Sequence, residues 1–247
     1  MGFYLFVLLI NIKNLPVKSI FIFLISLIIS VPLLSQAIIK PNFALATHPM
    51  VIDKINVSDS SVLVTLTLKN KVEGGEFCAN EIIYIQELKR KKKAYLLKAS
   101  GIPVCPNTYK FDKPGEELTF ELEFFGFYET PDYINIIEDC NANCFTIYGI
   151  IINKEMNHDV DMGFSLYKSG NPELSVASFE KAVKEHPDYP FGYLHENIID
   201  VYAELKNYEK AREWYQLLIS SNFVDKDQIL EQISRKDYFN HLETGEK

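Results

Sequence analysis

The run DMGFSLYKSGNPELSVASFEKAVKEHP, residues 161–187, carries the signals of two helices joined by a short turn. Gly170 and Asn171 stand between two apolar patterns, where glycine favours the end of a helix and asparagine favours a start. Pro172 follows in the first turn of the second helix, where its missing N–H costs nothing. Pro187 closes the second pattern, so the run predicts a helical hairpin.

A second, weaker helical hairpin follows about 36 residues further along the chain. Its first helix begins at Pro190 and ends near Leu205, and Asn207 is a suitable cap for the next helix. Residues 225–233 and 235–242 predict a final capping helix with a polar outer face. Two hairpins at a fixed period indicate a repeat architecture.

Both hairpins resemble tetratricopeptide repeats, over roughly 70 residues. In the first hairpin, Gly163, Phe179, Ala182 and Pro187 match signature positions of the family, whereas Asp159 stands where the family prefers tryptophan. The second hairpin matches outright at Tyr202 and Ala211, approximately at Ile198 and Tyr215, and departs at His195, Ile199 and Phe223. The resemblance implies a module that binds other proteins.

In this family the first helix of each hairpin lines a concave groove that holds partner peptides. Matched position by position, the resemblance implies a groove formed by Asn157, Val160, Phe164, Tyr167, Lys168, Tyr193, Glu196, Asp200 and Glu204. Aromatic side chains beside carboxylates would suit a peptide with basic and apolar side chains. The alternative is that Phe164 and Tyr167 pack within the stack and that the acids form a solvated face.

Two repeats are fewer than an independent stack usually needs. We expect the capping helix, the preceding domain or a second copy of the chain to cover the ends. A homo-oligomer is therefore one of the open possibilities.

In the middle of the chain, apolar residues recur with a period of two. In residues 61–68, Val62, Val64 and every second residue after them lie on one face of the expected strand. Residues 117–124 show the same alternation. Further strands are expected at residues 51–57, 82–88, 94–99, 133–137 and 145–152. Seven short strands separated by turn signals predict an all-β, sandwich-like domain.

All four cysteines, Cys78, Cys105, Cys140 and Cys144, fall in this β-rich segment. An even number in an exported chain favours disulfides. Extending the hairpin around the basic turn 90–93 would place Cys78 opposite Cys105, so we prefer Cys78–Cys105 and Cys140–Cys144 among the three possible pairings.

Other chemistry is conceivable for the same segment. The cysteines could hold zinc or form a redox dithiol, and Asp139, Asn141 and Asn143 alternate like the first ligands of a calcium loop. Cys144 and Ile150 occupy the places of that loop's glycine and closing glutamate, which argues against calcium. The basic run 89–93 could attract anionic lipid or polysaccharide, or be a solvated turn. We expect no metal and no cofactor.

The N-terminus resembles an export signal. Residues 19–34 are uncharged, and Lys13 and Lys18 precede them. Cleavage is expected after Ala37 or, better, after Ala46, because small residues stand at the positions that the small-x-small rule requires. The alternative is an uncleaved membrane anchor over residues 19–39. Both readings place the rest of the chain outside the cytoplasm.

The net charge of −8 restricts the partners. In residues 157–247, 17 acidic residues outnumber 10 basic ones. Because nucleic-acid binding needs a basic surface, we expect no nucleic acid partner. A basic or apolar protein or peptide of the cell envelope fits better, with membrane contact limited to the N-terminal apolar segment.

The sequence thus predicts α and β structure in separate domains. Residues 1–46 form a signal peptide or anchor, residues 47–156 the disulfide-containing β domain, and residues 157–247 the helical module. The expected function is that of a non-catalytic exported adaptor, periplasmic, extracellular or membrane-anchored.

The alternative function is a β domain that binds a glycan or small molecule, with the repeats used for assembly. Exposed aromatic side chains on one sheet face, with Tyr84, Tyr95 and Tyr133 as candidates, would favour it. Catalysis is not expected, because the five histidines form no recognisable catalytic or metal motif. They are His48, His158, His186, His195 and His241.

Overall fold

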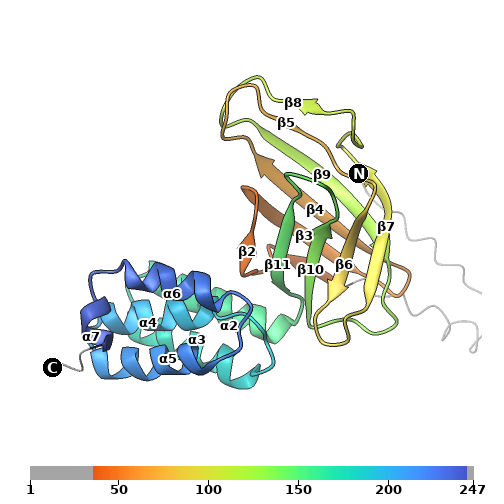
Figure 1. Cartoon of the computed structure of the whole chain (residues 1–247). Helices are drawn as coiled ribbons and strands as arrows, with labels where there is room; N and C mark the ends of the chain where they lie inside the picture. The colour runs from red at the N-terminus through yellow and green to blue at the C-terminus, as the bar shows by residue number, and fades with distance from the viewer. Residues whose placement is uncertain (1–35, 244–247) are drawn as a thin grey trace, which may run out of the picture. The chain divides into compact units, whose positions relative to one another are not determined.

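The computed structural model of the chain describes residues 36–243, which form an antiparallel sheet followed by helices (Figure 1). The sheet contains β1 (Gln36–Ile39), β2 (Leu45–Ala46), β3 (Met50–Val57), β4 (Ser61–Lys69), β6 (Ile83–Glu87), β7 (Lys93–Ser100), β9 (Glu117–Phe125), β10 (Tyr133–Glu138) and β11 (Thr146–Ile151). A two-stranded ribbon pairs β5 (Glu76–Phe77) with β8 (Tyr109–Lys110). The prediction of an all-β part followed by an all-α part is confirmed.

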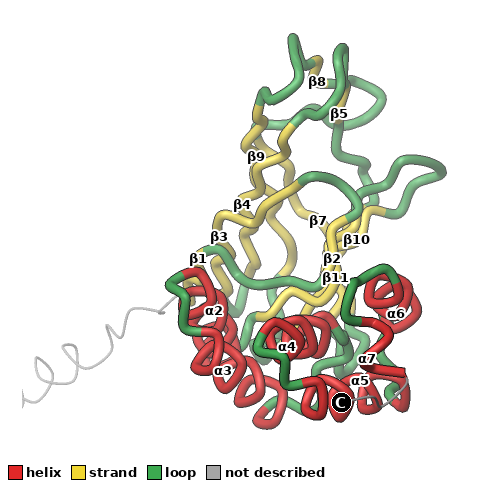
Figure 2. The backbone as a smooth tube through the Cα atoms, turned by 90° about the vertical axis from the view of Figure 1, so that its left-hand side faces the viewer, coloured by secondary structure: helices red, strands yellow, loops and turns green. Residues whose placement is uncertain are grey.

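The nine strands form one continuous sheet in the order β1-β3-β4-β9-β7-β6-β10-β11-β2. The strand β7 connects its two halves, because Tyr95 pairs with Tyr84 of β6 whereas Ala99 pairs with Leu122 of β9. The sheet curls at this strand, so β3 and β4 face β10 and β11 across the core (Figure 2). This continuous pairing differs from the two separate sheets of the predicted sandwich.

The alternation of apolar and polar residues explains the curl. In β4 and β9 every second side chain is buried, as the period of two predicts. Leu66 and Leu122 are fully buried, and Ile85 and Ile136 of the other half of the sheet belong to the same buried cluster. Burying one face of each half against the other removes both from water without a second sheet.

Residues 36–39 and 45–46, which fall within the leader expected from the sequence, form strands of the sheet. Ile38 of β1 is buried and pairs with Ile55 of β3, and Ala46 of β2 pairs with Ile147 of β11. Cleavage after Ala46 would remove both strands. The rest of the expected signal or anchor lies in residues 1–35, outside the described residues. Within residues 36–243, every helix is too short or too polar to cross a membrane.

Two disulfides join Cys78 to Cys105 and Cys140 to Cys144, with Cα–Cα distances of 5.3 and 5.6 Å. The preferred pairing is therefore confirmed. The hairpin expected to place Cys78 opposite Cys105 does not extend that far, because β7 leaves β6 for β9 after its first residues. A parallel bridge between Ala79 and Val104 brings the two cysteines together instead. The two disulfides indicate an oxidising, exported environment.

Six helices follow the sheet within the described residues. They are α2 (Lys154–Lys168), α3 (Pro172–Glu185), α4 (Tyr193–Glu204), α5 (Tyr208–Ser220), α6 (Lys226–Ser234) and α7 (Phe239–Glu243). The side chain of Asn153 caps α2 by accepting a hydrogen bond from the backbone N–H of Met156. Gly170 ends the turn after α2 with φ of +77°. The helices form two consecutive pairs, α2–α3 and α4–α5.

The first helix pair packs closely because Gly163 has no side chain. A Cβ at this position would overlap the ring of Phe179 on α3. The hydroxyl of Ser175 donates a hydrogen bond of 2.8 Å to the Gly163 carbonyl, which fixes the crossing of α2 and α3. Phe164 packs edge-on against the same Phe179 ring, with 4.9 Å between ring centroids.

The helices are covered by the sheet at one end and by α6 and α7 at the other. Tyr133 and Ile151 of the sheet belong to the same buried cluster as the helices, as does Leu242 of α7. Tyr189 donates a hydrogen bond of 2.5 Å to the carbonyl of Gly149. Of the three expected covers, the capping helix and the β domain are both present within one chain.

Candidate interaction groove

The acidic residues of α4 lie on one helix face. Glu196, Asp200 and Glu204 follow one another at intervals of four residues, so their side chains stand in a row. Tyr167 of α2 reaches this row, because its hydroxyl donates a hydrogen bond of 2.5 Å to Glu204 Oε2. The structure therefore brings together one predicted aromatic residue of α2 and one predicted acidic residue of α4.

A hollow of about 460 Å³ lies beside this row. Its walls are Tyr167, Asp200, Ala203, Glu204, Tyr208, Lys236, Asp237, Tyr238 and His241. The rings of Tyr208 and His241 stack in parallel with 4.1 Å between centroids, which forms an aromatic wall on one side. This volume is within the range of about 300–1,000 Å³ that is usual for binding sites.

The C-terminal segment supplies a cation to the acidic row. Lys236 Nζ lies 3.1 Å from one Asp200 oxygen and 3.9 Å from Glu196 Oε1. Tyr238 also donates a hydrogen bond to Asp200. The sequence predicts a cap over residues 235–242 but not this contact, because a lysine in a polar segment gives no signal of its partner.

The protonation of the groove depends on burial and on hydrogen bonds. Burial raises the pKa of Glu196, the charge of Asp200 adds to this effect, and Lys236 opposes it. The hydrogen bond to Glu204 raises the pKa of Tyr167. Burial and the hydrogen bond to Asp200 raise the pKa of Tyr238, which stays neutral at physiological pH. The groove thus presents carboxylates flanked by neutral phenols.

Two of the predicted groove residues are buried rather than presented to a partner. Asn157 accepts a hydrogen bond of 2.8 Å from the backbone N–H of Asn42, and its amide donates to the Ile151 carbonyl. Val160 is fully buried. Both residues attach α2 to the sheet and to its neighbours, a role that the helical periodicity did not indicate.

The remaining predicted residues differ in exposure. Phe164 is half-buried against Phe179, and Tyr193 is half-buried beside Tyr189, with 6.0 Å between ring centroids. Lys168 is exposed at the end of α2. The predicted set is therefore divided into exposed residues near the hollow and residues that hold the stack together.

Comparisons of the chain with protein-family models, with curated proteins and with solved structures found no match. The interpretation of the groove consequently rests on its own geometry.

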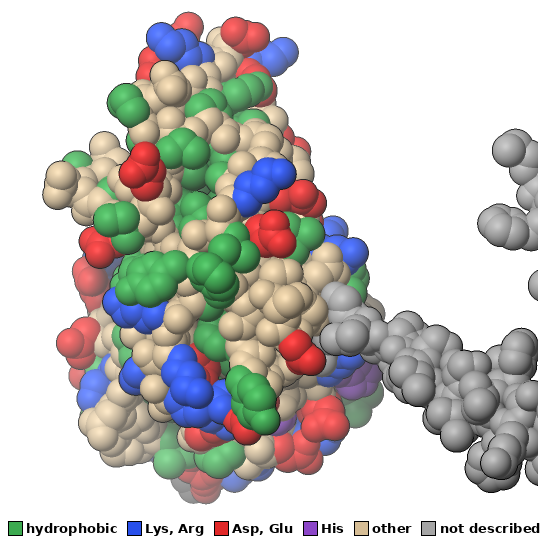
Figure 3. Space-filling view, turned by 90° about the vertical axis from the view of Figure 1, so that its right-hand side faces the viewer, with side chains coloured by type: hydrophobic (Ala, Val, Ile, Leu, Met, Phe, Trp, Pro, Cys, Tyr) green, Lys and Arg blue, Asp and Glu red, His purple; other side chains and the backbone are tan. Residues whose placement is uncertain are grey.

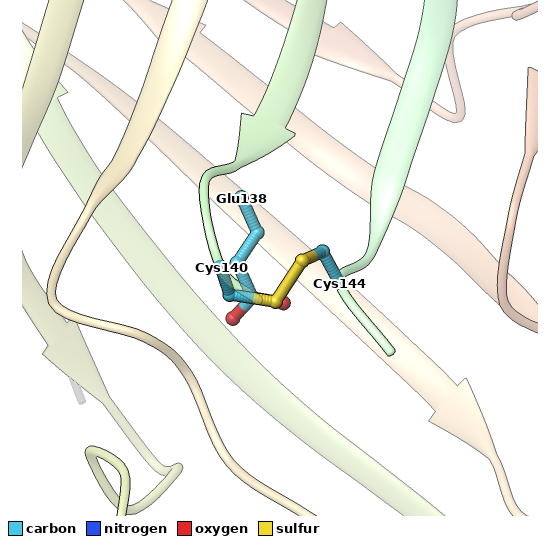
Figure 4. A group of neighbouring side chains, drawn as sticks. All are labelled: Glu138, Cys140 and Cys144. Atoms are coloured by element: carbon cyan, nitrogen blue, oxygen red, sulfur yellow. A yellow bond between two sulfur atoms is a disulfide. The ribbon is translucent and has the colours of Figure 1, made fainter. Parts of the chain in front are cut away.

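The cysteine-rich loop of the sheet does not provide a metal site. Glu138, Cys140 and Cys144 bring potential ligand atoms within 4.8 Å of one another (Figure 4). However, the two sulfur atoms are bonded to each other, so neither is a thiolate. The Glu138 carboxylate accepts hydrogen bonds from the backbone N–H groups of Asn80, at 2.7 Å, and Phe145, at 2.9 Å. The cluster therefore closes a loop.

The basic run of residues 89–93 is engaged in internal contacts. Lys89 Nζ bridges Asp132, at 2.7 Å, and Asp188, at 2.6 Å, which joins the sheet to the turn before α4. Arg90 pairs with Glu87 and Glu129. These ion pairs neutralise part of the run, in keeping with a structural turn rather than an anion site.

The three candidate tyrosines of the sheet do not share one surface. Tyr84 and Tyr95 pack together on the exposed side of β6 and β7, with 5.8 Å between ring centroids. Lys93 Nζ lies 4.0 Å from the centroid of the Tyr84 ring. Tyr133 is buried beneath the helices, against Tyr189.

Proposed function

We propose that this chain is a non-catalytic, exported adaptor whose helix pairs bind a protein segment carrying a basic side chain beside an apolar one. The observation that carries the proposal is the hollow beside α4, where Asp200 and Glu204 share the wall with Tyr167 and Tyr208. A lysine or arginine would pair with the carboxylates, and an apolar neighbour would pack against the rings.

Three features support assignment of the helices to the tetratricopeptide repeats. Helices α3 and α5 begin 36 residues apart, at Pro172 and Tyr208, which is close to the family period. Gly163 permits the close crossing of the first pair. In addition, α2 and α4, the first helix of each pair, are the helices that supply Tyr167 and Glu204 to the hollow.

The location follows from the disulfides and the N-terminal sequence. Two disulfides require an oxidising compartment for their formation. We take residues 1–35 to contain the export signal or anchor, because their apolar run follows two lysines. The partner would then be a periplasmic, extracellular or membrane-anchored protein of the cell envelope.

A selection from short random peptides tests the proposal. The oxidised protein comprising residues 36–247 is immobilised, and bound peptides are sequenced. We expect enrichment of lysine or arginine next to aromatic or aliphatic residues. Glu204→Lys should weaken binding of the selected peptides roughly tenfold, because it places a like charge in the hollow.

Glu209→Lys on α5 is the matched control. It makes the same change of charge at an exposed helical position that does not line the hollow. Binding should be retained in this variant. Selected peptides without basic residues, or equal losses in the two variants, would overturn the proposed function.

A second candidate function is glycan binding by the sheet. It is favoured by the exposed pair of Tyr84 and Tyr95, which offers ring faces for stacking against a sugar. Figure 3 shows hydrophobic side chains gathered on the side of the molecule where β6 and β7 lie. A glycan array should then show binding that Tyr95→Ala abolishes and that Tyr128→Ala, at a residue 94% exposed in a loop, preserves.

A further inference from the structure

A second cavity lies inside the helical module, away from the acidic hollow. It has a volume of about 170 Å³, and its walls include Met156, Val183, Tyr189, Phe191 and Phe223. An apolar cavity of about 150 Å³ engineered in another protein holds benzene. The cavity is thus large enough for a group the size of one aromatic ring.

The cavity is accessible beside the turn between α3 and α4. His186 and Pro187 line it there, and both are at least partly exposed, whereas Met156 deep inside is fully buried. An apolar wall with little exposed charge favours a neutral ligand, because burial of an unpaired ion is costly.

His195 supplies a buried polar group to the wall of this cavity. Its side chain is only 6% exposed and is held between the rings of Trp214, at 5.1 Å, and Phe223, at 4.7 Å. Its Nδ1 atom is buried without a hydrogen-bond partner among the described residues. Such an orphaned atom is unfavourable. His195 lines the cavity but its Nδ1 has almost no area open to it, so a ligand hydroxyl bonds to this atom and relieves the penalty once the ring turns toward the cavity.

The protonation of His195 restricts the chemistry of the ligand. Burial lowers the pKa of His195 to about 4, so the imidazole is neutral at physiological pH. One ring nitrogen of a neutral imidazole donates and the other accepts a hydrogen bond. A hydroxyl group can satisfy either nitrogen, because it both donates and accepts.

We propose that the cavity lined by His195 binds a ring-sized apolar group that carries one hydroxyl, with phenols as the ligand class. A free phenol and the tyrosine side chain of a partner share this chemistry. The site is separate from the acidic hollow, so this proposal does not depend on the proposed function.

Titration of the ¹⁵N-labelled full-length protein with p-cresol and with toluene tests the proposal by NMR. We expect saturable shifts at the residues that line the cavity, and roughly fivefold tighter binding of p-cresol, the gain of one hydrogen bond. In His195→Phe the two compounds should bind equally. Absence of saturable shifts with p-cresol, or an unchanged preference in His195→Phe, would overturn the proposal.

Val183→Phe provides a second test, since the larger side chain fills the cavity from α3. Both compounds should lose binding in this variant, and retention of p-cresol binding would contradict the assigned site. Should this variant not fold, the His195→Phe comparison decides by itself. Competition between p-cresol and a tyrosine-containing peptide then distinguishes the two sources: displacement by the peptide supports a partner's tyrosine, and no displacement supports a free phenol.

Discussion

The ammonium group of Lys236 lies 3.1 Å from the carboxylate of Asp200, a residue 36 positions earlier in the chain. Lys236 therefore stands where a basic side chain of a bound peptide would be attracted. Tyr238 bonds to the same carboxylate, so the chain's own C-terminal segment presents a basic and an aromatic side chain to the acidic row. These internal contacts are of the same kind as those proposed for the bound segment.

Removal of Lys236 should strengthen binding of a basic peptide. In Lys236→Ala the groove loses a positive charge that repels the incoming cation, and we expect the Kd of a selected lysine peptide to fall roughly threefold to tenfold. The stability should change by less than about 1 kcal/mol, since the Lys236 side chain is 38% exposed. Calorimetry at low salt measures the affinity.

Lys210→Ala on α5 is the control for this experiment, because Lys210 pairs with Glu213 and does not line the hollow. An affinity that is unchanged in Lys236→Ala, or that rises equally in both variants, would contradict the view that Lys236 repels a basic side chain from the acidic row.

The docking of the helices on the sheet should depend on Gly149. This residue has φ of +65°, and a Cβ there would lie 2.7 Å from the Tyr189 hydroxyl and 2.7 Å from Phe191 Cδ2. Gly149→Ala should therefore reduce the free energy of unfolding by about 3 kcal/mol, from backbone strain and overlap together. Urea denaturation measures the loss.

Gly115→Ala is the matched control for Gly149→Ala. Gly115 has φ of +88°, but a Cβ there would meet no atom within 4 Å. Gly115→Ala should reduce the free energy of unfolding only by the cost of backbone strain, about 1–2 kcal/mol. Equal losses at the two glycines would show that the contact with Tyr189 and Phe191 contributes nothing.

The two disulfides should contribute unequally to stability. Cys78 and Cys105 are separated by 27 positions and Cys140 and Cys144 by 4. From the entropy of loop closure, their removal should cost about 3.5 and about 2 kcal/mol respectively. Paired cysteine-to-serine variants, compared by urea denaturation, test the order. A larger loss of stability on removal of Cys140–Cys144, the disulfide that closes the shorter loop, would refute the entropic account.

Acid should destabilise the helical module through His195. Its pKa in the folded protein is about 4, below the ordinary value of 6.5, so the unfolded chain binds the proton more readily. The contribution of His195 to the free energy of unfolding therefore falls as pH decreases from about 6.5 to about 4, by up to roughly 3 kcal/mol.

Comparison with His195→Phe isolates this contribution, because the other titrating groups are common to both proteins. The stability of the wild type should decline more steeply over this pH interval. Parallel stability profiles for the two proteins would show that His195 is not buried in its neutral form.

Local patterns predicted the elements well, for reasons visible in β4 and α4. Alternation in β4 identifies a strand with one buried face, and the spacing of Glu196, Asp200 and Glu204 places three acids on one side of a helix. Both inferences need only the geometry of a single element. The turn at Gly170 was equally predictable, since glycine readily adopts its positive φ.

Contacts between distant segments were not predictable in the same way. The pairing of β1 with β3 depends on residues 36–39, whose apolar composition matched a leader equally well. The burial of His195 depends on Trp214 and Phe223, which lie on other elements. The ion pair of Lys236 with Asp200 likewise joins positions that no local periodicity relates.

Site-specific photo-cross-linking in cells of the native host tests the central claim most directly. A photoactivatable phenylalanine replaces Tyr167 beside the hollow or, as a control, Leu217, which is 53% exposed on α5. The account predicts cross-links from position 167 to a discrete envelope protein, lost when Glu204→Lys is added, and none to that protein from position 217. No discrete cross-link from position 167, or the same product from both positions, would contradict a partner-binding groove between α2 and α4.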